Sequence, residues 1–210
     1  MPNPSAQQAT SMTYTLPRYR SYQDYLDDEQ LYGEKDYRLL STGEVIEVAS
    51  EDELNRIIAY TLIEAFLKAY GVSFIRRIRR GDKELQVQPV GDRWVNRKPD
   101  LMVMQPEHLE ITRKAIFFDM PAPAFVAEVV SPGSKSSISY QRDYVWKRQQ
   151  YEWWQIPEYW IIDPHRGQIM VLTLANKTYQ EAIYQGGDEI ISAAFPLLHL
   201  SVDALLTKPS

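Results

Sequence analysis

The sequence predicts a single α/β domain in which helices flank a central mixed β-sheet. Short apolar segments at residues 100–104, 125–130 and 159–162 have the length and composition of buried strands. Apolar residues recur at helical spacing in residues 51–70 and 140–154. Because strands and helices alternate along the chain, we expect both helices to pack on one sheet that contains the three strands.

The chain before the first long helix predicts an arm followed by two small elements. Residues 1–18 are rich in Pro, Ser, Ala and Gln and have no apolar period, so a flexible arm is expected there. Residues 19–210 are expected to form the single domain. Within them, residues 21–31 predict a short amphipathic helix, and residues 37–48 predict extended chain interrupted by a turn.

The first long helix has recognisable end signals. Ser50 is a candidate N-cap, and Gly71 is expected to end the helix. After it, residues 72–79 predict a strand, and residues 84–90 predict its hairpin partner across a Gly-Asp turn.

The second half of the chain contains the segments that we expect to form the centre and one edge of the sheet. A short helix is expected near residues 107–112. The strand at 125–130 is apolar on both faces apart from Glu128, which is typical of a central strand. Residues 171–173 and 179–183 predict outer strands.

Composition excludes several classes of protein. The 210 residues include no cysteine, so disulfides and thiolate metal sites are ruled out. No apolar run is long enough to span a bilayer, and residues 1–20 lack a signal-peptide pattern, so we expect a cytoplasmic protein without a membrane partner. The net charge of −5 argues mildly against a nucleic-acid binder, without excluding a local basic patch.

One dense basic cluster stands out against this acidic background. It contains Arg76, Arg77, Arg79, Arg80 and Lys83, of which the four arginines are the candidate nucleic-acid contacts. Two interpretations remain open: a track for the phosphates of a nucleic acid, or a solvated strand end, which is slightly favoured.

Two single carboxylates lie on otherwise apolar strands. Burying Asp100 or Glu128 is costly unless the charge is paired or bound to a metal. Side chains alternate along a strand, so Asp100 shares a face with Met102 and Glu128 shares one with Val126. If the strands are neighbours, both acids can converge on one point, where their oxygens suit Mg²⁺ or Mn²⁺. Alternatively, Asp100 caps a turn and Glu128 pairs with a structural cation.

The second long helix adds a third candidate element. Asp143, Lys147 and Tyr151 are spaced i, i+4, i+8, so they lie along one face. An acid four residues before a lysine is also the ordinary way to stabilise an exposed helix, and that interpretation stays open.

Together these segments resemble a known family. The Pro-Asp dipeptide and the acid in the following apolar strand resemble the PD-(D/E)XK nuclease superfamily, and the wider stretch resembles the Uma-type family of putative restriction endonucleases, also filed as a domain of unknown function. The resemblance covers roughly residues 20–205. The matching segments are Gly43-Glu44-Val45, Leu54-Asn55, Pro99-Asp100-Leu101, Glu128-Val129-Val130-Ser131-Pro132, Arg142-Asp143-Tyr144 with Lys147 and Tyr151, and Ile156-Pro157-Glu158-Tyr159-Trp160-Ile161-Ile162-Asp163-Pro164.

The resemblance implies a restriction-endonuclease-like core, a divalent metal and phosphodiester hydrolysis in nucleic acid, with DNA as the expected substrate and a homodimer as the expected assembly. Asp100 and Glu128 would hold Mg²⁺ or Mn²⁺. The superfamily's usual lysine, two residues after the second acid, is replaced by Val130, and the family's alternative is a lysine on the following helix, here Lys147. Lys147 would orient the attacking water or stabilise the developing phosphate charge.

Five further residues are candidates for accessory roles. Glu44 and Glu51 could each add an acid near the metal, although each is also explained as a surface acid. Asn55 could hydrogen-bond inside the site or cap locally, and Asp143 and Tyr151 accompany Lys147 on its helix face.

A different class of function competes with the nuclease. The negative net charge and the missing standard lysine favour a catalytically silent homodimeric binding or scaffold module. The two acids on apolar strands favour the metal-dependent nuclease.

Overall fold

The computed structural model describes residues 17–31, 35–48, 52–111 and 114–207. The predicted arm at 1–18 therefore lies outside the described residues except for its last two, of which Arg18 forms a β-bridge with Glu44. The helical elements are α1 (Tyr22–Asp27), η1 (Glu29–Leu31), α2 (Glu53–Tyr70), η2 (Val72–Arg77), α3 (His108–Ile111), α4 (Ile138–Tyr140), η3 (Gln141–Trp146), α5 (Lys147–Trp153) and α6 (Val202–Leu206). None of these described helices is both long and apolar enough to cross a membrane.

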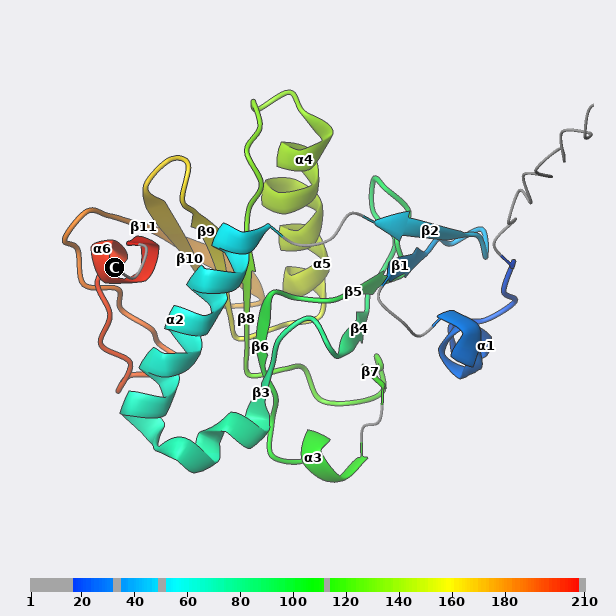
Figure 1. Ribbon diagram of the computed structural model, residues 1–210, viewed down its shortest axis with the longest axis horizontal. Coiled ribbons are helices and arrows are strands. Elements are labelled where there is room, and N and C mark those ends of the chain that lie inside the picture. The colour runs from blue at the N-terminus through cyan, green and yellow to red at the C-terminus, as the bar shows by residue number, and fades with distance from the viewer. Residues whose placement is uncertain (1–16, 32–34, 49–51, 112–113, 208–210) are drawn as a thin grey trace, which may run out of the picture.

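Across the described residues the strands form three sheets, of six, three and two strands (Figure 1). The strands are β1 (Asp36–Leu39), β2 (Val45–Val48), β3 (Ile78–Arg79), β4 (Glu84–Gln86), β5 (Asn96–Arg97), β6 (Leu101–Val103), β7 (Ala115–Ile116), β8 (Phe125–Val129), β9 (Glu158–Asp163), β10 (Gln168–Ala175) and β11 (Thr178–Gln185). The largest sheet has the order β11-β10-β9-β8-β6-β3.

The middle of the large sheet confirms the predicted architecture. Strands β6, β8 and β9 are direct neighbours; β8 and β9 run parallel, whereas β6 and β8 run antiparallel. The sheet is therefore mixed, as predicted. The smaller sheets, β1-β2 and β5-β4-β7, lie to one side of it, away from α6 (Figure 1).

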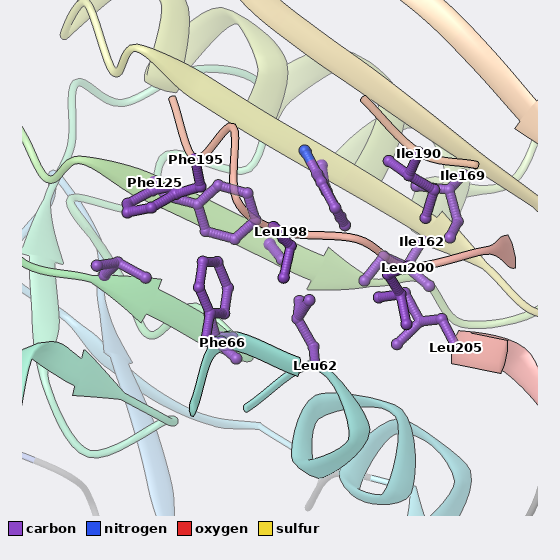
Figure 2. Packing of buried hydrophobic residues seen from close by; sticks show 14 of the residues in the cluster. Leu62, Phe66, Phe125, Ile162, Ile169, Ile190, Phe195, Leu198, Leu200 and Leu205 are labelled. Atoms are coloured by element: carbon purple, nitrogen blue, oxygen red, sulfur yellow. The ribbon is translucent and has the colours of Figure 1, made fainter. Parts of the chain in front are cut away.

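The two long helical segments cover opposite faces of this sheet. Leu62 and Phe66 of α2 pack in one cluster with Phe125 and other odd-numbered residues of β8 (Figure 2). Phe66 meets the rings of Phe125 and Phe195 edge to face, with centroids 5.4 and 5.1 Å apart. C-terminal residues such as Leu198 close this cluster (Figure 2).

The opposite face has its own apolar cluster. Tyr151 and Trp154 from the α5 segment pack with Val126 of β8, Met102 of β6 and Ile161 of β9. Even-numbered residues of β8 therefore point toward α5, so Glu128 points toward this helix as well.

Capping explains where α2 starts and ends. Asp52 accepts a hydrogen bond from the Leu54 N–H and is the N-cap, while the predicted cap Ser50 lies outside the described residues. Gly71 ends the helix, as predicted, with a φ of 85° and its N–H bonded to the Leu67 carbonyl. Such a positive φ favours glycine because it has no Cβ.

The hairpin predicted after α2 is wrong. Residues Val72–Arg77 form the 3₁₀ helix η2, because Phe74 turns back to stack on Phe66 and Tyr70, with centroids 5.7 and 5.0 Å apart. Only Ile78–Arg79 form a strand, which pairs with β6. Strand β4 instead pairs with β5 and β7 in the separate three-stranded sheet.

The helix predicted at 140–154 is present but is not uniform. It begins at Ile138 after the N-cap Ser137, and residues Gln141–Trp146 form a π-helical turn. There the Lys147 N–H bonds to the Arg142 carbonyl, five residues back. Such π turns occur often at functional sites.

Candidate active site

A cavity of about 400 Å³ lies where the N-terminus of α2, the start of β6, the end of β8 and the π turn meet the β1–β2 hairpin. The described residues that line it are Asp36, Arg38, Val48, Asp52, Asn55, Gly81, Trp94, Arg97, Lys98, Asp100, Glu128, Val129, Ser131, Arg142, Asp143 and Lys147. Its wall is thus strongly charged, with both signs present.

Strand pairing brings the two predicted acids together. The register pairs Leu101 with Ala127, so Asp100, one residue before β6, falls opposite Glu128 on β8. Side chains directly opposite one another in antiparallel strands share a face and are close neighbours. Asp100 Oδ2 also accepts a hydrogen bond of 2.6 Å from the Val129 N–H, which ties this carboxylate to β8.

Glu128 is held by two donors from the helix above it. The Lys147 ammonium donates to Glu128 Oε2 at 2.9 Å, and the Tyr151 hydroxyl donates to Oε1 at 2.6 Å. Glu128 is 2% exposed, so these contacts compensate a carboxylate that is almost removed from water. Burial and the nearby Glu128 charge raise the pKa of Tyr151 well above its usual value, so its hydroxyl stays protonated as a donor.

Lys147 connects Glu128 to a second buried acid. Its Nζ lies 3.0 Å from Asp143 Oδ1. Burial alone would lower the pKa of Lys147, but the charges of Asp143, Glu128 and Asp100 outweigh it and raise the pKa, so the ammonium stays charged.

Asp143 is fixed from its other side by Arg142. The Arg142 Nε and NH2 donate to the two oxygens of Asp143 at 2.9 and 3.1 Å. Burial would raise the pKa of Asp143, but Lys147 and Arg142 outweigh burial and hold the pKa below its usual value. The result is a continuous charged network from Arg142 through Asp143 and Lys147 to Glu128.

Asn55 takes part in the site through the backbone. Its side-chain amide donates to the Val129 carbonyl at 3.2 Å, and the residue is 8% exposed. Of the two interpretations that the sequence left open, the structure has Asn55 bonded inside the cavity, while Asp52 caps the helix.

The other accessory acids do not join this group. Glu44 is exposed, pairs with Arg18 at 3.1 Å and does not line the cavity. Glu51 lies outside the described residues.

None of the four arginines of the basic cluster lines the cavity. Arg77 donates to the Met104 carbonyl at 2.8 Å, Arg79 donates to carbonyls of its own segment, and Arg80 lies over the Tyr60 ring. Arg76 is exposed. Gly81, directly after Arg80, does line the cavity, whereas Arg77 is bonded at Met104, the end of β6 away from Asp100, so only the Arg80 end of the cluster adjoins the cavity.

Several cavity residues were missed by reasoning from the sequence. Arg97 and Lys98 directly precede the Pro-Asp dipeptide, and this position was a signal that could have identified them. Arg38 and Trp94 come from small strands and turns that carry no local sign of a site. Only tertiary packing brings these two residues to the cavity wall.

The residues present fit a divalent metal with few protein ligands. Within the described part of the chain, no group of three or more His, Cys, Asp or Glu side chains is arranged to hold a metal. Mg²⁺ commonly takes one or two carboxylates and completes its shell with waters and substrate phosphates. The hard oxygens of Asp100 and Glu128 match that requirement.

Comparisons with known proteins agree with this architecture. A crystal structure of a "putative nuclease belonging to DUF820" from Anabaena variabilis is similar with a TM-score of 0.55 and 14% sequence identity, over 81% of this chain and 89% of that chain. This likeness confirms the nuclease-like fold. No curated protein matches the chain. The family described as "Putative restriction endonuclease", Uma2, matches residues 22–203, and the chain therefore belongs to this family.

Proposed function

We propose that this protein is a Mg²⁺- or Mn²⁺-dependent endonuclease that hydrolyses phosphodiester bonds in nucleic acid, with DNA as its substrate. The observation that carries the proposal is the meeting of Asp100, Glu128 and Lys147 at one cavity. Family membership supports the nuclease class.

Asp100 and Glu128 are the residues that would hold the metal. When bound, the metal would supply Lewis-acid polarisation of the scissile phosphate and a lower pKa for a coordinated water. Placing both acids on adjacent strands fixes their spacing, because the backbone of the sheet is rigid.

Lys147 is the residue that would face the reacting phosphate. Its neighbours keep it charged, and an ammonium in a cavity partly closed to water stabilises negative charge strongly. Asp143, itself held by Arg142, gives Lys147 a second anchor. Lys147 would therefore keep Asp143 as an ionic partner if Glu128 held a metal.

Tyr151 would act as a positioning residue. Its protonated hydroxyl bonds Glu128 Oε1 from the buried side, which restricts the rotamer of that carboxylate. Outside the cavity, the arginine cluster on η2 and β3 would contact phosphates of the nucleic acid beside the scissile bond.

The decisive experiment is a cleavage screen of DNA and RNA with Mg²⁺ or Mn²⁺. We expect DNA cleavage that EDTA and the Glu128→Gln substitution abolish, because glutamine keeps the shape of the side chain and loses its charge. If Glu128→Gln cleaves as well as the wild-type protein, this site does not perform the reaction.

One observation favours a second function. Both oxygens of Glu128 are bonded, to Lys147 and to Tyr151, which is also the arrangement of a site that serves structure alone. A silent homodimeric scaffold would bind no Mg²⁺ at Asp100 and Glu128. Calorimetric titration of Mg²⁺ into the wild-type and Asp100→Asn proteins separates the two functions. An enzyme would bind Mg²⁺, and Asp100→Asn would weaken that binding, whereas a scaffold would show no Mg²⁺ binding in either protein. The homodimer and the cytoplasmic location stay predictions.

A further inference from the structure

Part of the cavity wall combines an aromatic ring with two arginines. Trp94 lines the cavity, as do Arg38 of β1 and Arg97 of β5. The guanidinium carbon of Arg97 lies 4.5 Å from the centre of the Trp94 ring, and that of Arg38 lies 5.8 Å from it. Among the described lining residues, Trp94 is the one aromatic side chain.

Arg97 holds this ring in place and is itself rigid. Its Nε donates to Gln150 Oε1 at 2.8 Å, and its NH2 donates to both oxygens of Asp92 at 3.2 and 3.0 Å. The residue is 1% exposed. A ring that stacks on so fixed a guanidinium is pre-organised, which lowers the entropy that a ligand must give up on binding.

The same wall has donors without partners. Within the described residues, Arg38 Nε and Arg97 NH1 are buried and have no hydrogen-bond partner. Because these two atoms are closed off from solvent near the Trp94 ring, the cavity wall presents the positive charge of the two guanidinium groups to a ligand and offers no free donor at these atoms. Trp94 supplies an aromatic ring to the cavity wall, and the positive charges of Arg38 and Arg97 near that ring favour a ligand with a flat base and a negatively charged group.

The volume of the cavity suits a group the size of one nucleotide. A volume of about 400 Å³ falls within the usual range of small-ligand sites, roughly 300–1,000 Å³. A base within an intact duplex is already stacked on its neighbours, so it reaches a pocket only when it is unpaired or flipped out. Stacking on an aromatic side chain tolerates any base, because every base has a π face.

We propose that Trp94, with Arg38 and Arg97, forms a nucleotide subsite beside the reacting phosphate, so that the substrate is a single strand or an unpaired strand end. This inference rests on the proposed nuclease function and specifies its substrate. The phosphate to be cleaved lies near Lys147, and the base of an adjacent nucleotide stacks on Trp94.

The test measures binding separately from cleavage. The full-length protein is titrated, in EDTA, into one fluorescein-labelled DNA sequence presented either as a single strand or as a blunt duplex, and anisotropy is recorded. The wild-type protein is expected to prefer the single strand by about tenfold or more, since a duplex must first unstack and unpair a base. Trp94→Leu should weaken single-strand binding roughly 5- to 100-fold, the effect of losing one base–aromatic stack.

Two further variants distinguish stacking from folding. Trp94→Phe keeps a π face and should recover most of the affinity lost in Trp94→Leu. Trp153→Leu is the matched control: Trp153 is 47% exposed, contacts Phe118 and does not line the cavity, so its loss should leave binding unchanged. Circular dichroism checks that all variants are folded.

Equal affinity for single strand and duplex would overturn the proposal. So would a Trp94→Leu effect no larger than that of Trp153→Leu, or no detectable binding of either DNA. Failure of the nuclease function is recognised differently: single strands bind in a Trp94-dependent way, but adding Mg²⁺ or Mn²⁺ produces no cleavage.

Discussion

Replacing Lys147 by methionine should lower the free energy of unfolding by about 3 kcal/mol. The Lys147 ammonium lies 2.9 Å from Glu128 and 3.0 Å from Asp143, whose side chains are 3% and 2% exposed. Removing one partner of a buried ion pair costs about 3–5 kcal/mol, because the remaining charge is left uncompensated. The lower end is expected here, since Tyr151 still donates to Glu128 and Arg142 still pairs with Asp143.

The assay is urea unfolding followed by circular dichroism, with a matched substitution one residue away. Arg148 pairs with Glu181 at 2.8 Å, but the two side chains are 32% and 35% exposed. Such partly exposed pairs contribute only about 0–1 kcal/mol, so Arg148→Met should change stability little. Equal losses in Lys147→Met and Arg148→Met, both below about 1 kcal/mol, would refute the view that Lys147 neutralises two buried acids.

Three other predictions concern activity, acid stability and assembly. Lys147→Ala should abolish cleavage and leave Mg²⁺ affinity nearly unchanged, whereas Asp100→Asn should weaken both; a strong loss of Mg²⁺ affinity in Lys147→Ala would contradict these roles. Burial would raise the pKa of Asp163, but hydrogen bonds from Tyr144 and Arg166 outweigh it and lower the pKa. When the pKa of an acid is lower in the folded state than in the unfolded state, the acid stabilises the fold. This stability is fully present above the pKa of the unfolded state, about 3.9, and is lost as the pH falls through the pKa of the folded state. Asp163→Asn should therefore flatten the acid limb of the stability curve, and an unchanged limb would exclude this residue as a cause. Light scattering should show a dimer mass, and a monomer mass at all concentrations would count against pairing.

Local sequence patterns predict the frame of the site because its strands and helices are regular and buried. The apolar runs around Asp100 and Glu128 identify two strands, which the structure pairs directly, and the spacing of Asp143, Lys147 and Tyr151 identifies the helix face above them. Two acids on apolar strands signal a site physically, since burial requires that each be compensated. These features depend on residues close in sequence, which a pattern can report.

Features that leave no mark in local periodicity or residue type are not predictable in this way. The segment after Gly71 has the composition of a strand, but stacking of Phe74 on Phe66 turns it into a 3₁₀ helix. The wall formed by Arg38 and Trp94 exists because separate small sheets converge at the cavity. No residue type specific to a π turn marks Gln141–Trp146, where one hydrogen bond spans five residues in place of four.

The position of Val130 explains why the cation comes from the helix. Val130 lies on the same face as Glu128, is 1% exposed and packs in the cluster with Tyr144 and Tyr151. A lysine there would have its ammonium among apolar side chains and would lose its hydration without compensation. Lys147 enters from above this cluster, where its stem crosses the helix surface and its ammonium reaches Glu128 and Asp143 together. The helix thus supplies at the cavity the charge that a packed strand position cannot carry, which makes the missing strand lysine compatible with an intact site.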